Sequence, residues 1–305
     1  MENKNPNIYL IGLGAIGCAL AAQAQNNGCR ISIICNENRK KRYKAEPFII
    51  NKQEYNFDYV TEKMNNEIDI LLIGVKFHHL PLALEEVKPF VTENTTIISL
   101  LNGINSEEII QSTLKNERIV HAFVVGTDST KFGTKVNFTK NGKIVLGSPI
   151  LEKEKMVKDA ASCLQRAGLN VEISDRILRD MWWKLMVNVG INQIAALHKI
   201  PYGVFNKNEH IKEMTSMAMS EVVQIAQVLK IDLSKEDIDQ VLILTEVWGE
   251  HSKASMLQDV ENKRKTEVEM FAGEICRLGE TNDVPTPINR FLFHAIKFIE
   301  KEYLL

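Results

Sequence analysis

Apolar residues in the first half of the chain form short continuous runs separated by segments of helical character. Four such runs lie at residues 7–13, 29–35, 69–76 and 95–101. Runs of this length are typical of strands that a parallel sheet buries on both faces. An Ala-, Leu- and Gln-rich segment follows the first run and ends at Asn27–Gly28, a common helix stop. The alternation predicts an α/β domain with a doubly wound, mostly parallel sheet.

The pattern changes after residue 118, where antiparallel strands are expected to join the sheet. Residues 118–126 are strand-like, and residues 134–139 are expected to pair with residues 143–146 through Asn141–Gly142, a strong two-residue hairpin signal. A helix at 152–167 and a strand at 169–173 should complete this domain, which we expect to span residues 1–175.

The second half is predicted to be all helical. Helical periodicity covers residues 209–230, 234–248 and 286–301. In the segment from Thr266, we expect Thr266 as helix N-cap, Glu267 at the first helical position and Glu269 as the capping-box partner. Residues 176–305 are therefore expected to form a helical domain, and the resemblance to a known family given below implies that it binds substrate and carries the catalytic residues.

The helix expected at residues 180–197 is apolar almost all the way round, as in helices that a protein interior surrounds. Lys184, Asn188 and Asn192 interrupt it four residues apart, so they form one polar stripe. Buried amides and ammonium groups cost free energy unless each finds a partner. A lone buried asparagine commonly joins two packed helices. Three polar residues in register, led by a lysine, favour a ligand site.

The first apolar run leads into a glycine motif, G-L-G-A-I-G, with strands expected on both sides of the helix that follows it. In this context Gly12 allows a tight turn, Gly14 lets backbone amides approach a pyrophosphate, and Gly17 lets the helix pack on the strand. The helix N-terminus then receives the anion. The motif predicts a Rossmann-like dinucleotide-binding domain, with cofactor contacts from Gly12, Leu13, Gly14, Ala15, Ile16 and Gly17.

The residues after the second run bear on which dinucleotide binds. Enzymes that use NAD usually place an acid there against the ribose hydroxyls, and enzymes that use NADP place a basic group against the 2′-phosphate. Here Asn36 and Glu37 are followed by four basic residues from Arg39 to Arg42. Glu37 is one position past the place expected for the acid. The sequence therefore favours NADP(H), with Asn36 and Arg39 as contacts.

Two further strands end in polar residues. Lys76 ends the run at 69–76, and Asn102–Gly103 follows the run at 95–101. The carboxyl ends of parallel strands are where ligands bind in open α/β sheets. Lys76 and Asn102 are therefore candidates for a site at this edge.

Composition excludes several classes of function. The chain has 37 basic and 39 acidic residues and a net charge of −2, which argues against a general binder of nucleic acids or membrane surfaces. The five cysteines and seven histidines show no metal-ligand or redox spacing, so no metal site is expected. Scattered cysteines, an N-terminus without an apolar run and the lack of a membrane-spanning stretch favour a cytoplasmic protein.

Taken together, these motifs resemble those of the ketopantoate reductases (2-dehydropantoate 2-reductases) along nearly the whole chain. The shared motifs, in family order, are the glycine motif, G-V-K at 74–76, N-G at 102–103, W-x-K-L-x-x-N-x-x-I-N from Trp182, and S-M-L-Q-D…R-x-T-E-V from Ser255. The glycine motif is shared by many dehydrogenases, whereas the two later motifs are more specific. The resemblance implies NADPH-dependent reduction of 2-dehydropantoate to D-pantoate in pantothenate synthesis.

The resemblance also implies roles for individual residues. Lys184 would be the general acid that protonates the ketone oxygen. Glu267 would complete the polar network of that lysine and also contact cofactor. The implied substrate-binding residues are Asn188, Asn192, Ser255 and Asn102, and Asn102 with Lys76 would bridge substrate and cofactor.

The chain departs from the family pattern at three positions. Asn36, His79 and Leu101 stand where many members have Arg, Gln and Gln, respectively. Two alternatives therefore remain open: reduction of another branched 2-keto acid to a D-2-hydroxy acid, with NADH as the possible donor, and a non-catalytic dinucleotide sensor. The long apolar helices of the second half could pack within one chain or against a partner, and of these two arrangements we favour a homodimer.

Overall fold

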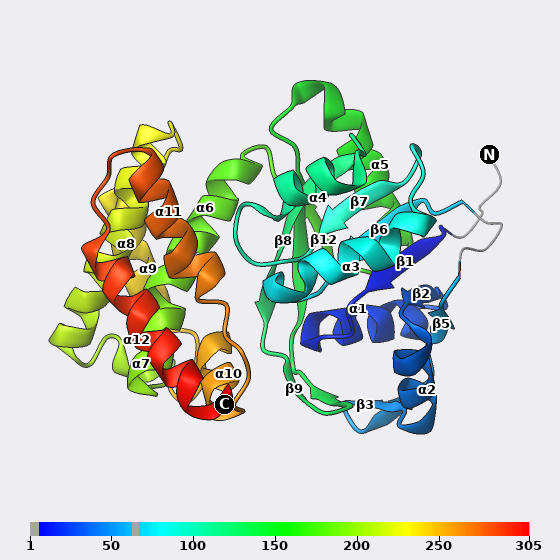
Figure 1. Cartoon of the computed structure of the whole chain (residues 1–305), viewed down its shortest axis with the longest axis horizontal. Helices are drawn as coiled ribbons and strands as arrows, with labels where there is room; N and C mark the ends of the chain where they lie inside the picture. Colours follow the sequence, from blue (N-terminus) through cyan, green and yellow to red (C-terminus); the bar gives the residue numbers. More distant parts are fainter. Residues whose placement is uncertain (1–5, 63–66, 305) are drawn as a thin grey trace. The chain divides into compact units, whose positions relative to one another are not determined.

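Eight strands of the first half form one sheet in the computed structural model, which describes residues 6–62 and 67–304. The chain divides into two compact units, Met1–Ile177 and Leu178–Leu305. Within the first unit the strand order is β12-β11-β8-β7-β6-β1-β2-β5 (Figure 1). The strands are β1 (Ile8–Ile11), β2 (Ile31–Ile34), β5 (Asp58–Val60), β6 (Ile70–Ile73), β7 (Thr96–Ser99), β8 (Ile119–Thr127), β11 (Asn141–Gly147) and β12 (Val171–Ile173).

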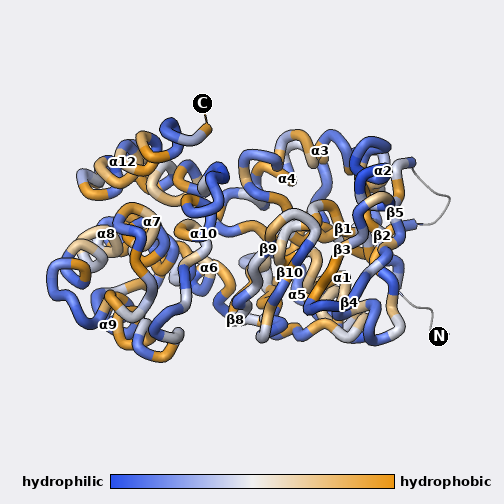
Figure 2. The backbone as a smooth tube through the Cα atoms, turned by 90° about the horizontal axis from the view of Figure 1, so that it is seen from below, coloured by the Kyte–Doolittle hydropathy of each residue, from blue (hydrophilic) through white to orange (hydrophobic). Residues whose placement is uncertain are grey.

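The predicted doubly wound arrangement is confirmed. The strands from β5 to β8 are parallel, and the chain crosses from one side of β1 to the other between β5 and β6. Figure 2 shows α3 and α4 on one side of β1 and β2, with α1 and α5 on the other side. The helices of this unit are α1 (Ala15–Asn26), α2 (Glu37–Ala45), α3 (Leu80–Val87), α4 (Ser106–Leu114) and α5 (Glu154–Arg166). Because β1 lies at this crossover, the carboxyl ends of β1 and β6 form the place where open α/β sheets bind ligands.

The expected hairpin through Asn141–Gly142 is wrong. These two residues begin β11, which pairs antiparallel with β8 and parallel with β12. The chain turns earlier, at Gly133 with φ of 59°, and the carboxylate of Asp128 accepts hydrogen bonds from the backbone N–H groups of Thr139 and Lys140. This closure leaves β11 available to extend the main sheet.

A second, four-stranded sheet in the order β4-β3-β10-β9 was not expected from the sequence. It consists of β3 (Phe48–Ile50), β4 (Gln53–Tyr55), β9 (Thr130–Phe132) and β10 (Lys135–Asn137). β10 pairs antiparallel with β9 and parallel with β3, which is more than 80 residues away in the sequence. The sheet therefore depends on pairing between distant segments, which local pattern does not reveal.

The second unit is helical, as predicted. Its long helix runs through α6 (Ile177–Val187), a π-helical turn at Asn188–Asn192 and α7 (Gln193–His198). The other helices are α8 (Glu209–Val228), α9 (Lys235–Leu244), α10 (Ser255–Glu261), a second π-helical turn at Glu269–Gly273, α11 (Glu274–Thr281) and α12 (Pro287–Leu304). None of the helices in the described ranges is long and apolar enough to cross a membrane.

Candidate functional site

The glycine motif forms a tight turn between β1 and α1. Gly12 has φ of 104°, and a Cβ atom there would lie 2.6 Å from the carbonyl of Gly74. A Cβ atom on Gly17 would lie 2.1 Å from the Gly12 oxygen, so only glycine allows the helix to pack this closely. At Gly14 the nearest atom would be 3.7 Å away, an ordinary contact. The packing of the protein therefore requires Gly12 and Gly17, whereas Gly14 leaves space beside the backbone.

The N-terminus of α1 is suited to an anion. The helix begins at Ala15 and has no acidic side chain in its first turn, so the positive end of its dipole is not neutralised locally. The ammonium of Lys131, on β9, donates a hydrogen bond to the backbone oxygen of Leu13 at 2.5 Å. Leu13 is buried and Ile16 packs against the core, so both offer backbone rather than side-chain groups to a ligand. These features fit the pyrophosphate of a dinucleotide.

Lys131 was missed by sequence reasoning because it lies 118 residues from Leu13. It belongs to the unexpected second sheet, and its ammonium also lies 5.4 Å from the ring centroid of Phe48. No motif in the sequence marks this lysine, since its role depends on how β9 folds back towards β1.

Asn36 and Arg39, the residues expected to choose the cofactor, share one carboxylate. Asn36 caps α2 by accepting a hydrogen bond from the backbone N–H of Arg39 at 2.9 Å. Its Nδ2 donates to Oε1 of Glu86 at 3.1 Å, and Nη1 of Arg39 donates to Oε2 at 3.3 Å. Glu86, on α3, was not singled out in the sequence. The nearby Glu37 has a lowered pKa, chiefly because the Thr61 side chain forms a hydrogen bond with it.

Lys76 and Asn102 follow neighbouring strands at equivalent positions. β6 and β7 are paired in register, with Ile73 opposite Ser99. Lys76 lies three residues after Ile73, and Asn102 lies three residues after Ser99. Both side chains are partly buried. The structure therefore places the two predicted residues at the same edge of the sheet.

A buried polar network fixes the loop that carries Asn102. The Ser99 hydroxyl lies 2.7 Å from that of Ser106 and accepts a hydrogen bond from the Leu101 backbone N–H at 3.3 Å. The Ser106 hydroxyl donates to Oε2 of Glu107 at 2.9 Å, and burial raises the pKa of Glu107 to about 7. Leu101 is itself buried, so its side chain is part of the core.

Three of the predicted substrate-binding residues, two of them from the polar stripe, are linked by hydrogen bonds in the second unit. Nδ2 of Asn192 donates to Oδ1 of Asn188 at 2.7 Å, and the Ser255 hydroxyl donates to Oδ1 of Asn192 at 3.3 Å. Asn188 and Asn192 are 8% and 7% exposed. Nδ2 of Asn188 has no hydrogen-bond partner in the described part of the chain. A buried donor without a partner costs about 1–3 kcal/mol, which a bound acceptor would offset.

The two asparagines lie on a π-helical turn rather than on the regular α-helix that their spacing predicts. Such turns are rare and often found at functional sites. Gly190 lies inside the turn, and a Cβ atom there would lie 2.5 Å from a methyl carbon of Met219 on α8. Close packing of α8 against this glycine accompanies the wider turn, a feature that residue spacing alone does not reveal.

Lys184 has the electrostatic properties of a proton donor near neutral pH. Burial lowers the pKa of Lys184 from 10.5 to about 8, while the nearby Glu267 carboxylate opposes this shift. Glu267 is only 7% exposed. The structure thus brings the two predicted catalytic residues into electrostatic contact.

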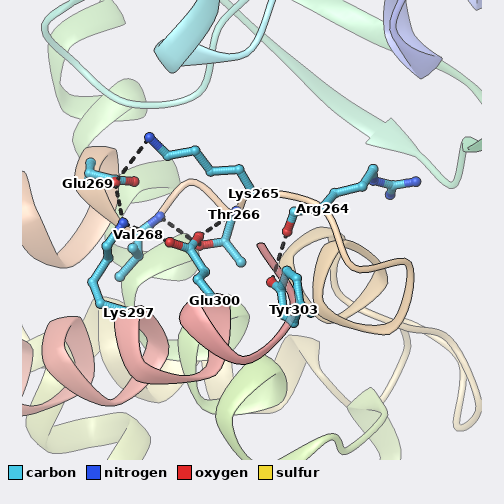
Figure 3. Close-up of polar contacts among 8 residues, drawn as sticks. All are labelled: Arg264, Lys265, Thr266, Val268, Glu269, Lys297, Glu300 and Tyr303. Carbon is cyan, nitrogen blue, oxygen red and sulfur yellow. Dashed lines mark hydrogen bonds and ion pairs between the residues drawn. The ribbon is translucent and has the colours of Figure 1, made fainter. Parts of the chain in front are cut away.

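Hydrogen bonds hold the segment that carries Glu267 against α12 (Figure 3). The backbone N–H and hydroxyl of Thr266 both donate to Oε1 of the buried Glu300, at 2.7 and 2.6 Å. Lys297 donates to Oε2 of Glu300 at 2.8 Å, and the Tyr303 hydroxyl donates to the Arg264 oxygen at 2.9 Å. Lys297 also donates to Oε1 of Glu269 at 2.8 Å, so Glu267 lies between residues that are anchored to α12 on both sides.

The capping box expected at Thr266 is wrong in its partner. The Thr266 hydroxyl does accept a hydrogen bond from the Val268 N–H at 3.3 Å, but Glu269 forms ion pairs with Lys297 and Lys265. The π-helical turn begins at Glu269, and the Glu267 carbonyl before it already accepts hydrogen bonds from the N–H groups of Met270 and Phe271. A carboxylate from α12, distant in sequence, takes the place of the local partner.

The described residues do not form a cluster of metal-binding side chains at the candidate cofactor site or at the candidate substrate site. Among residues 6–62 and 67–304, no three His, Cys, Asp or Glu side chains come together in a way that would hold an ion. All five cysteines are free thiols.

Comparison with known proteins covers nearly the whole chain. The family model described as ketopantoate reductase PanE/ApbA matches residues 8–149, and the model of its C-terminal part matches residues 176–300. The 2-dehydropantoate 2-reductase of Aquifex aeolicus is 28% identical over 299 residues, which cover 94% of this chain and 95% of that protein. The corresponding protein of Pyrococcus horikoshii is 26% identical over 302 residues, covering 95% and 96%.

Solved structures show the same fold. A complex of D-mandelate dehydrogenase with NADH has a TM-score of 0.88 at 25% identity, covering 97% of this chain and 99% of that one. A PanE/ApbA family ketopantoate reductase from Ralstonia eutropha has a TM-score of 0.84 at 21% identity, covering 98% and 100%. With its glycine turn, its lysine–asparagine helix and both family models matched in order, the chain belongs to the ketopantoate reductase family.

Proposed function

We propose that this protein reduces 2-dehydropantoate to D-pantoate with a reduced nicotinamide dinucleotide, as a step of pantothenate synthesis. The observation that supports this most directly is Lys184, whose pKa is lowered to about 8 beside the buried Glu267 carboxylate. A general acid works best when its pKa lies near the working pH.

The reaction needs a proton at the ketone oxygen. A bound reduced nicotinamide would supply the hydride for the carbonyl carbon, which leaves negative charge on the ketone oxygen. The Lys184 ammonium stabilises this charge and transfers its proton, a contribution of typically ~10²–10⁴-fold in rate. Glu267 favours the charged form of Lys184 and thus keeps the proton available at neutral pH.

The amides of the polar stripe are proposed to hold the substrate. Nδ2 of Asn188 is a buried donor that lacks a partner among the residues described, and it would bind an oxygen of the 2-keto acid. Asn192 donates a hydrogen bond to Oδ1 of Asn188, and Ser255 donates one to Oδ1 of Asn192. Both would orient the substrate, with Ser255 at its carboxylate end. Lys76 and Asn102 would bridge substrate and cofactor.

The glycine turn, the N-terminus of α1 and Lys131 would hold the cofactor pyrophosphate. The run of basic residues from Arg39 favours NADPH as the reductant, although Arg39 itself is paired with the Glu86 carboxylate. Glu267 would contribute to the cofactor contacts as well. We expect the protein to act in the cytoplasm. We also expect a homodimer, since one structural neighbour is described as a dimeric ketopantoate reductase.

A second candidate is reduction of another 2-keto acid to a D-2-hydroxy acid. It is supported by the likeness to D-mandelate dehydrogenase and by Leu101 and His79, which replace residues common in the family. A non-catalytic dinucleotide sensor is the third, although a sensor has no need of a buried proton donor.

Initial rates with a panel of 2-keto acids test these candidates. The panel comprises 2-dehydropantoate, 2-ketoisovalerate and benzoylformate, each with NADPH and with NADH. We expect the highest kcat/KM with 2-dehydropantoate. A clear preference for another acid would support the second candidate, and cofactor binding without oxidation by any acid would support the sensor.

A further inference from the structure

We propose that Glu86 is a determinant of cofactor specificity that disfavours NADPH relative to NADH. This rests on the proposed function only in requiring that the chain bind a nicotinamide dinucleotide. The sequence alone favours NADPH, and the structure supplies the carboxylate that alters this expectation.

The carboxylate of Glu86 engages both residues expected to meet the 2′-phosphate. One oxygen accepts from Nδ2 of Asn36 at 3.1 Å and the other from Nη1 of Arg39 at 3.3 Å. The Glu86 side chain is 15% exposed and that of Arg39 is 33% exposed. The ion pair is thus partly shielded from solvent, where screening by salt and water is weaker.

The first two cations after β2, Arg39 and Lys40, are each paired with a carboxylate, whereas Lys41 and Arg42 are exposed on α2. Lys40 lies 3.8 Å from the Glu37 carboxylate, and the Arg42 guanidinium lies 5.1 Å from the ring centroid of Tyr43. At the Cys35 thiol, the electrostatic effects of Arg39 and Lys40 oppose those of Glu37 and Glu86. Two cations are therefore matched by two carboxylates where the second strand ends.

This balance treats the two cofactors differently. A 2′-phosphate carries about −1.5 to −2 charges at neutral pH. It would have to displace Glu86 from Arg39 or lie beside a second anion. A ribose hydroxyl is neutral and donates to carboxylates, so the same carboxylate accepts the unphosphorylated ribose.

The test is Glu86→Gln, with Glu85→Gln as the matched control. Glu85 is an exposed neighbour on the same helix, so its replacement removes one charge adjacent in sequence to Glu86 but outside the ion pair. Dissociation constants for NADPH and NADH are measured by titration calorimetry on the full chain without a keto acid. Retained NADH binding shows that each variant is folded.

We expect the wild-type protein to bind NADH at least as tightly as NADPH. Glu86→Gln should shift the ratio of affinities towards NADPH by about tenfold or more, and Glu85→Gln should leave it unchanged. If Glu86 instead orients Arg39 for the phosphate, Glu86→Gln will weaken NADPH selectively, and the proposal is wrong. An equal change for both cofactors, or a strong wild-type preference for NADPH, overturns it as well. Failure to reduce 2-dehydropantoate would refute the proposed function without altering this binding ratio.

Discussion

Replacement of Glu267 by Gln should move the alkaline limit of the reduction to lower pH. Lys184 donates a proton, so the rate falls as pH rises through its pKa. Burial lowers the pKa of Lys184 to about 8, and the Glu267 carboxylate opposes that shift by favouring the ammonium form. The amide of Gln has nearly the same shape but no charge. In the variant, burial would therefore lower the pKa of Lys184 further, because no carboxylate would oppose it.

The magnitude follows from the loss of one adjacent charge. Removing an opposite charge at close range typically changes a pKa by about one unit or more, equivalent to about 1.4 kcal/mol. At pH 8 the protonated fraction of Lys184 should then fall from about one half to about one tenth or less. A loss of about fivefold in kcat/KM is expected at pH 8, beyond any loss that is the same at every pH.

The assay is the initial rate of cofactor oxidation with 2-dehydropantoate between about pH 6 and about pH 10. Glu261→Gln serves as control, because its carboxylate pairs with Lys253 on the surface. The control should keep the wild-type profile. An unchanged alkaline limb in Glu267→Gln, or a limb displaced to higher pH, would show that Glu267 does not set the proton affinity of Lys184.

Three further changes test other parts of the structure. Lys184→Ala should lower kcat by about 100-fold or more while leaving cofactor affinity nearly intact, and an active variant would exclude Lys184 as the general acid. Lys131→Met should weaken NADPH and NADH equally, by about tenfold in calorimetric titrations, because the pyrophosphate is common to both; a selective effect would contradict this placement. Glu300→Gln should lower the free energy of unfolding by about 2 kcal/mol, seen as a lower Tm, since the buried acceptor of two Thr266 hydrogen bonds is weakened. The exposed Glu302→Gln is its control, and equal Tm values would argue against this anchoring role.

Features that depend on local spacing along the chain could be predicted from the amino-acid pattern alone. Residues that alternate between buried strands and helices predicted the doubly wound sheet, since each element must bury its own apolar face. Gly12 and Gly17 could be identified because their constraints arise within one turn. Asn188 and Asn192 could be placed on one face because helical periodicity relates residues four apart.

The folded chain was needed to show which distant groups contact these local features. Arg39 and Glu86 are 47 residues apart, and Leu13 and Lys131 are 118 apart. The partner of β10 and the anchor of Thr266 likewise come from distant segments. A hydrogen bond or ion pair depends on separation in space, and a linear sequence does not encode that separation until the sheet order and helix packing bring the segments together. The glycine turn was therefore predictable, whereas the charges around the nucleotide site were not.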